Sequence, residues 1–318
     1  MEKFGKRVVQ LRIPILILSL VLLVPSFLGY VSTRVNYDIL SYLPKDIETM
    51  VGQDILVDEF GTGAFSMFVV EGMAPKDVSR LKSDIEQVEH VEKVIWYDSV
   101  MDLSVPMEIM PDELYEAFNS GDATMMAIIF DETTSADGTM EAIENIRKVA
   151  DKNCFLSGMS AVVTDTKNLS EREAPIYVCI AVLLSCLVLS LTMDCFLIPF
   201  LFLLSIGMAI VYNLGSNIFM GQISYITKAL SAVLQLGVTM DYSIFLWHSY
   251  QDQNTRIPDK KEAMAKAIGE TVTSVVSSSM TTVAGFIALC FMSFTLGMDL
   301  GVVMAKGVVI GVIACITI

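Results

Sequence analysis

The chain has 318 residues, 53% of them hydrophobic, and its mean hydropathy is +0.59. This composition is too apolar for an ordinary soluble domain. The net charge of −15 is local, because residues 32–173 hold 28 acidic and 11 basic residues, a net charge of −17. We do not expect this acidic block to bind nucleic acid or anionic lipid through charge.

Six apolar stretches are long enough to cross a bilayer, which takes about 20 residues in a helix. They are residues 13–31, 175–193, 196–214, 229–248, 272–294 and 300–318. The first is longer than a typical signal-peptide core and lacks a clear cleavage site, so we expect a retained helix rather than a cleaved signal. The last is still apolar at residue 318, and we expect the polypeptide to continue beyond it.

Basic residues predict the orientation, because Lys and Arg gather on the cytoplasmic side of membrane proteins. They precede the first span and fill the connection between the fourth and fifth spans: Lys3, Lys6, Arg7, Arg12, Arg256, Lys260, Lys261 and Lys266. We therefore expect a multi-pass protein of the cell membrane with a cytoplasmic N-terminus and with residues 32–173 outside.

The acidic block has the pattern of a small α+β domain. After a helix at 46–60, β-branched and aromatic runs alternate with amphipathic helices in the order strand, helix, strand, strand, helix, strand. These elements are predicted at 65–72, 75–89, 91–98, 123–132, 136–151 and 153–158, with a loop of short helical character at 99–121. This order is typical of the ferredoxin-like fold.

The predicted fold class is therefore an α-helical polytopic membrane protein with six spans and an inserted α+β, ferredoxin-like extracytoplasmic domain. The expected division is a cytoplasmic N-terminus and first transmembrane helix at 1–31, the extracytoplasmic domain at 32–173 and the remaining helices at 174–318. No catalytic constellation and no metal-binding cysteine spacing occur in the sequence, so we expect no enzyme activity, metal or other cofactor.

Asp241 is the residue that most needs an explanation, because it lies within the apolar fourth span. A carboxylate there costs at least about 2.5–3.5 kcal/mol on insertion scales. Such residues serve in proton relays, in ion coupling or as partners of buried cations, and the alternative is a structural hydrogen bond to a neighbouring helix. We interpret Asp241 as a relay residue, with Tyr242 either ordering groups beside it or simply packing.

Several residues are candidates to support this site through helix contacts. Gly237 lies one turn before Asp241 and is expected to let a neighbouring helix approach closely. Three hydroxyl residues of the fifth span, Ser274, Ser278 and Thr282, share one face because they recur every four residues. They either pack helices together or carry protons toward Asp241, and both roles are compatible.

Lys306 is the other ionisable residue inside a span, and Asp299 lies near the start of the same span. A helix rises 1.5 Å per residue, which places Lys306 about 9 Å nearer the outer surface than Asp241. We therefore expect Lys306 to extend to the outer interface, with direct pairing to Asp241 as the alternative. Asp299 is expected in water at the outer end.

Four segments resemble the MmpL-type branch of the resistance-nodulation-division superfamily. They are NYDILSYLP (36–44), GVTMDYSIFL (237–246), SSMTTVAGFIALCFMSF (278–294) and LGMDLGVVMAKG (296–307). The order of one span, a large outer domain and five further spans also fits, so the resemblance covers essentially the whole chain. One departure is Thr239, where the family pattern favours glycine.

The resemblance implies an exporter of hydrophobic or lipid-like molecules, driven by the proton gradient, with Asp241 as proton carrier and Tyr242 as its partner. It also implies that residues 32–173 are a porter domain and that a second repeat is needed, in the same longer chain or in another subunit. The expected partners are therefore protons, membrane lipid, the lipid-like substrate and that repeat, and no nucleic acid.

Two other function classes can be weighed against the sequence, and the first of them remains open. A non-transporting, sterol-sensing-like regulator or half-unit partner would have the same fold and would not need Asp241. An intramembrane hydrolase would need a serine–histidine pair, a zinc motif or a second facing aspartate, and none of these is present.

Overall fold

A computed structural model describes residues 2–60, 64–99, 112–193 and 197–318, and these divide into two compact units. The helical unit consists of residues 1–43 and 171–318. Residues 44–170 form the second unit, which is named the outer domain after its expected location. Residues 32–43 and 171–173, predicted to belong to the outer domain, therefore lie in the helical unit. The physical reason is that residues 34–36 form a strand that pairs with a strand between membrane helices.

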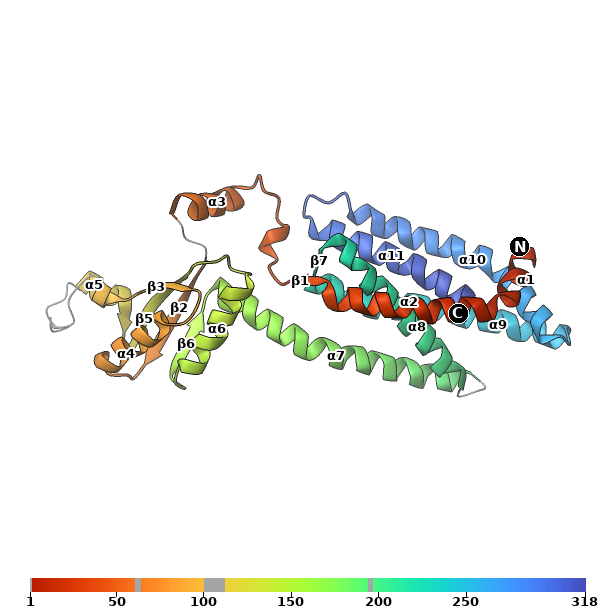
Figure 1. Cartoon of the computed structure of the whole chain (residues 1–318), viewed down its shortest axis with the longest axis horizontal. Helices are drawn as coiled ribbons and strands as arrows, with labels where there is room; N and C mark the ends of the chain where they lie inside the picture. Colours follow the sequence, from red (N-terminus) through yellow and green to blue (C-terminus); the bar gives the residue numbers. More distant parts are fainter. Residues whose placement is uncertain (1, 61–63, 100–111, 194–196) are drawn as a thin grey trace. The chain divides into compact units, whose positions relative to one another are not determined.

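Six helices of the described residues are long and apolar enough to cross a membrane, in agreement with the six predicted spans (Figure 1). They are α2 (Arg12–Ser32), α7 (Met159–Thr192), α8 (Leu197–Gly215), α9 (Tyr225–Arg256), α10 (Lys260–Leu289) and α11 (Leu296–Thr317). The fifth span was predicted to reach residue 294, but α10 ends at Leu289 because residues 290–295 form the turn into α11.

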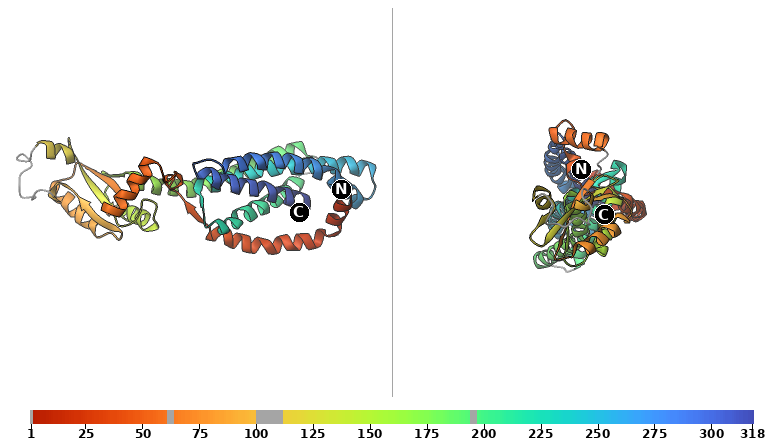
Figure 2. Two further views of the ribbon diagram at one scale, coloured as in Figure 1. Left: turned by 90° about the horizontal axis from the view of Figure 1, so that it is seen from above. Right: turned by 90° about the vertical axis from the view of Figure 1, so that its left-hand side faces the viewer.

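The helical unit carries small elements at both ends. The short helix α1 (Glu2–Gln10), which the sequence analysis did not predict, packs against α10. At the other end, β1 (Arg34–Asn36) pairs in parallel with β7 (Gln222–Ser224). The 3₁₀ helices η1 (Leu40–Tyr42) and η4 (Ser216–Met220) lie next to these strands in sequence. Both chain termini lie at the α1 end of this unit (Figure 2).

The segment 36–44 acts as a compact connector after the first span. The Asp38 amide donates to the Asn36 side chain at 2.9 Å, and the Leu40 amide donates to the Asp38 carboxylate at 2.8 Å. The Thr295 hydroxyl and amide both donate to the Tyr42 carbonyl, at 2.9 and 3.0 Å. Burial raises the pKa of Tyr42 to about 12, so its phenol stays neutral at any physiological pH.

The outer domain has the predicted ferredoxin-like topology. Its elements are α3 (Glu48–Phe60), β2 (Ala64–Glu71), α4 (Pro75–Glu86), β3 (Val91–Ile95), η2 (Tyr97–Ser99), α5 (Asp112–Phe118), β4 (Asn119–Ser120), β5 (Ala123–Phe130), α6 (Asp137–Val149) and β6 (Cys154–Ser157). The strand order is β3-β5-β2-β6 with every neighbouring pair antiparallel, and β4 adds to β5. The part of the predicted loop at 100–111 lies outside the described residues.

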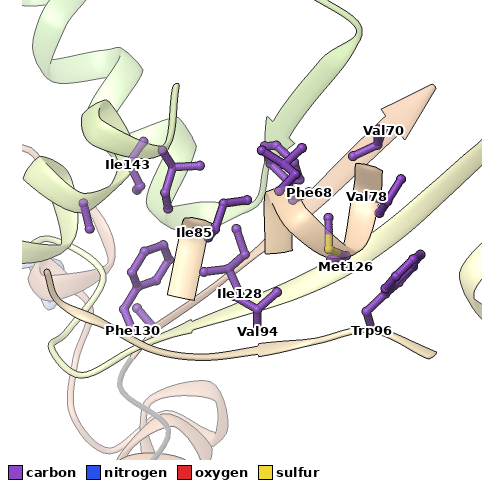
Figure 3. Packing of buried hydrophobic residues seen from close by; sticks show 14 of the residues in the cluster. Phe68, Val70, Val78, Ile85, Val94, Trp96, Met126, Ile128, Phe130 and Ile143 are labelled. Atoms are coloured by element: carbon purple, nitrogen blue, oxygen red, sulfur yellow. The ribbon is translucent and has the colours of Figure 1, made fainter. Parts of the chain in front are cut away.

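The core of this domain lies between the sheet and the helices α4 and α6 (Figure 3). Alternate residues of β2 and β5 face inward, as the period of two in a half-buried strand requires. Phe68, Met126 and Phe130 are at most 1% exposed, and Ile85 and Ile143 reach the same core from the two helices. The apolar spacing that predicted these helices therefore corresponds to the buried face, except at Val149, which is 42% exposed at the end of α6.

Candidate functional site

Asp241 lies on a face of α9 that the rest of the described chain leaves uncovered. The opposite face of α9 is buried. It carries a polar residue at every fourth position: Thr227, Ser231, Gln235, Thr239 and Ser243. Asp241 is two residues beyond Thr239, which turns it by about 200°. Its side chain is exposed in the described chain, although it lies in the middle of a membrane helix.

A groove of about 390 Å³ holds Asp241 together with all the predicted hydroxyl residues. It is lined by Val238, Asp241, Tyr242 and Phe245 of α9 and by Ser274, Val275, Ser278 and Thr282 of α10. The fourfold spacing that predicted a shared hydroxyl face on α10 thus corresponds to one wall of this groove. The acid and the hydroxyl groups therefore share one groove, whose other lining residues are apolar.

Tyr242 differs from Asp241 in that it points into the bundle. It is 8% exposed and packs with Val275 of α10 and Val312 of α11. Its phenol lies beside the hydroxyl groups of Thr282 and Ser278. The packing role and the ordering role proposed for this residue are therefore both compatible with its position.

The hydroxyl groups keep hydrogen-bonding capacity for a partner in the groove. The Thr282 hydroxyl donates to the Ser278 carbonyl over a long 3.4 Å, and a donor held so weakly is readily shared. Ser274 and Ser278 are exposed in the described chain. Polar side chains exposed at membrane depth need water or protein as partners.

Within the described residues, Gly237 makes no close contact with a neighbouring helix, so the contact that the sequence predicted stays a prediction. A Cβ atom built on Gly237 meets no described atom within 4 Å, and the residue is exposed. Close approaches involve other glycines, such as Gly29 of α2 against Gly215 of α8 and two glycines of α11. A Cβ on Gly307 would lie 2.5 Å from Nδ2 of Asn213, and one on Gly311 would collide with the Thr239 hydroxyl.

Lys306 lies apart from the groove and is bonded at the end of the helical unit that carries β1 and β7. Its ammonium donates to Oδ1 of Asn217 in η4 at 2.5 Å. Lys306 does not line the Asp241 groove, and its described partner is Asn217, not Asp241.

The expectation for Asp299 was wrong. This residue is 7% exposed, and its carboxylate accepts from the Thr227 hydroxyl at 2.6 Å and from the Ser224 amide at 2.8 Å. The acid is buried because it joins the start of α9 to the start of α11. A helix-end position in sequence does not reveal that a neighbouring strand covers it.

The buried polar stripe of α9 was missed by the sequence analysis. Nδ2 of Asn213 in α8 donates to Oε1 of Gln235 at 3.1 Å, in the middle of this stripe. The signal was present in the sequence as five polar residues spaced by four along an apolar span. Separately, no group of three or more His, Cys, Asp or Glu residues could hold a metal ion in the described ranges.

Comparison with known proteins gives the family. The model of the MMPL family matches residues 55–318. The membrane protein MJ1562 of Methanocaldococcus jannaschii is 22% identical over 96% of this chain and 89% of its own length. The siderophore exporter MmpL5 of Mycobacterium tuberculosis is 23% identical over 56% of this chain.

The matched lengths differ strongly between relatives. The match covers 20% of the length of MmpL5. The membrane protein ActII-3 of Streptomyces coelicolor is 31% identical over 36% of this chain, and the match covers 16% of ActII-3. Among solved structures, the translocon-associated membrane protein SecDF of Thermus thermophilus is similar in fold, with a TM-score of 0.52 and 14% identity. The match covers 99% of the present chain and 37% of the SecDF chain. That likeness shows a shared fold, and the family match shows that this multi-pass membrane protein belongs to the MMPL family.

Proposed function

We propose that this chain is a repeat of an exporter that uses the proton gradient to move hydrophobic or lipid-like molecules out of the cell. The observation that carries this proposal is the groove in which Asp241 lies beside Tyr242, Ser278 and Thr282 within two apolar helices. A titratable acid at membrane depth, surrounded by hydroxyl groups, is what proton uptake and release require.

The chemistry follows from the cost of charge in a bilayer. When Asp241 is ionised, the carboxylate costs at least about 2.5–3.5 kcal/mol at this depth and attracts hydroxyl donors and water. Protonation removes that charge, so the preferred position of α9 against its neighbours changes. Tyr242 and the hydroxyl residues of α10 hold the donors through which a proton reaches or leaves the acid. Lys306 is a second ionisable residue within the spans. It lies outside the groove and is bonded to Asn217.

The open groove favours a protein partner over lipid. Asp241, Ser274 and Ser278 are all exposed in the described chain, and a lipid tail offers none of these side chains a hydrogen bond. We propose that a second repeat covers this face, in the same polypeptide or in another subunit. In this arrangement the N-terminus is cytoplasmic, residues 32–173 lie outside the cell membrane, and residues 44–170 act as the porter domain.

The test compares exported lipids from cells that make the native gene product or its Asp241→Asn variant. Because asparagine is isosteric and cannot titrate, we expect the variant to lose the lipid species that wild-type cells release into the medium, as measured by untargeted mass spectrometry. An ionophore that collapses the proton gradient should have the same effect on wild type. Unchanged export by Asp241→Asn would refute the proton-carrier role.

The second candidate is a half-unit partner or sterol-sensing-like regulator that does not itself transport. One observation favours it: the relative MJ1562 aligns over 89% of its own length, so relatives of about this extent occur. The intact mass of the native gene product separates the two readings. A mass near 35.0 kDa indicates a unit that needs another subunit, whereas about twice that mass indicates two repeats in one chain.

A further inference from the structure

A second recess lies at the α1 end of the helical unit, away from the Asp241 groove. It has a volume of about 480 Å³ and is lined by residues of α1, α2, α8, α9, α10 and α11. We infer that this recess binds an anionic diacyl phospholipid from the leaflet on that side of the membrane. One acyl chain fills the recess, and the phosphate lies against Arg12, Lys260 and Lys261.

The interior of the recess is suited to a hydrocarbon chain. Its wall includes Ile198, Leu201 and Phe202 of α8, Leu246 of α9 and Ile268 of α10. The volume is within the roughly 300–1,000 Å³ of pockets that enclose ligands of drug size. Apolar cavities stay dry and take up apolar molecules. In a bilayer the abundant apolar molecule is a lipid tail.

The mouth of the recess carries the charge that selects the head group. Arg12 begins α2, and Lys260 and Lys261 begin α10, so three exposed cations from two helices line one opening. Among the described residues, none of the three forms an ion pair within 4.0 Å. Unpaired basic residues between transmembrane helices at this level bind anionic lipid head groups.

Acidic neighbours reduce this charge without cancelling it. A smaller recess beside the first is lined by Asp259 and Glu262 together with Lys6, Arg12 and Lys261. The Asp259 carboxylate is engaged as the N-cap of α10, where it accepts from the Lys261 amide at 2.9 Å. The two recesses together carry four basic and two acidic side chains, so the mouth retains a positive charge.

Trp247 supplies an independent indication of a ligand. It lines the recess and contacts the rings of Phe202 and Tyr250, with centroid distances of 6.5 and 5.4 Å. Its indole Nε1 is buried and has no hydrogen-bond partner among the described residues. A buried N–H donor needs an acceptor. The ester carbonyl of a phospholipid lies between phosphate and tail, at the level where Trp residues concentrate in membrane proteins.

The two tryptophans of the chain make the test direct. Trp96 lies in the core of the outer domain, and a Trp96→Phe change leaves Trp247 as the sole tryptophan of the 318-residue chain, which is excited selectively over tyrosine at the long-wavelength edge of its absorption. The Trp96→Phe chain is reconstituted in phosphatidylcholine vesicles that contain small fractions of phosphatidylglycerol with brominated acyl chains. Bromine quenches tryptophan at contact. We expect stronger quenching by brominated phosphatidylglycerol than by brominated phosphatidylcholine at the same mole fraction.

Charge variants separate head-group binding from general contact with lipid. Each of Arg12→Gln, Lys260→Gln and Lys261→Gln should lower the apparent affinity for phosphatidylglycerol roughly fivefold. Lys266→Gln is the matched control, because Lys266 is on α10 and does not line the recess. Thermal unfolding of every variant verifies that the fold is retained.

Three outcomes would overturn the inference. Equal quenching by the two brominated phospholipids would show that the basic mouth does not select the head group. No quenching by either would show that the recess is filled by protein, either by further residues of the polypeptide or by a second copy. A single-chain fatty acid that relieves the quenching by brominated phosphatidylglycerol as well as unbrominated phosphatidylglycerol does would identify that simpler amphiphile as the occupant. The inference does not depend on Asp241 and fails or succeeds separately from the transport proposal.

Discussion

At Gly311 the backbone of α11 lies against the Thr239 hydroxyl of α9, with no room for a methyl group. The family resemblance favoured glycine at position 239, and the chain has threonine there. The substitution is accommodated because the facing residue of α11 is itself a glycine. Thr239 is 1% exposed, so the contact belongs to the buried stripe of α9 and not to the Asp241 groove.

This contact predicts a strong response to a small substitution. Gly311→Ala should destabilise the helical unit by about 1–3 kcal/mol, because the added methyl group must displace Thr239 or shift α11. Denaturant titration of the protein in detergent micelles, followed by far-ultraviolet circular dichroism, measures the change. Gly207→Ala in α8 is the control, since a Cβ there meets no described atom within 4 Å. Equal stability of the two variants would contradict the close packing.

At the scale of elements, α9 is a helix with two polar faces that serve different neighbours. The buried face meets α8 and α11, where Gln235 bonds to Asn213 and Thr227 bonds to Asp299. The uncovered face carries Asp241 and shares its groove with α10. Sequence periodicity identified the hydroxyl face of α10. The buried face of α9 became evident only in the structure, because a polar residue at every fourth position does not show which neighbouring helix lies opposite.

The hydroxyl face of α10 is predicted to assist proton transfer. The double variant Ser278→Ala/Thr282→Val should lower the rate of lipid export roughly fivefold, the factor that corresponds to one lost hydrogen bond of about 1 kcal/mol. The rate is measured by lipid release from cells at equal protein levels. Ser277→Ala serves as the control, because Ser277 is exposed on α10 but does not line the groove. An unchanged rate in the double variant would assign this face to packing alone.

At the scale of the whole molecule, the uncovered Asp241 face predicts a protein partner. A nitroxide spin label at Gly237→Cys, in a background without the native cysteines, should be shielded from oxygen dissolved in the bilayer. A label at Val24→Cys should be accessible, since Val24 is 64% exposed on α2. Electron paramagnetic resonance of the reconstituted native gene product measures both. Equal oxygen accessibility at the two positions would show that the groove faces lipid.

The sequence by itself determined the six spans, the ferredoxin-like topology of the outer domain and the placement of Asp241 within a span. These features follow from hydrophobic length and periodicity, which are local properties of the chain. Only the tertiary structure decided which glycines mediate close contacts, that Asp299 is buried and that residues 32–43 belong with the helices. Each of these depends on which distant segment lies opposite, and no local pattern specifies that pairing.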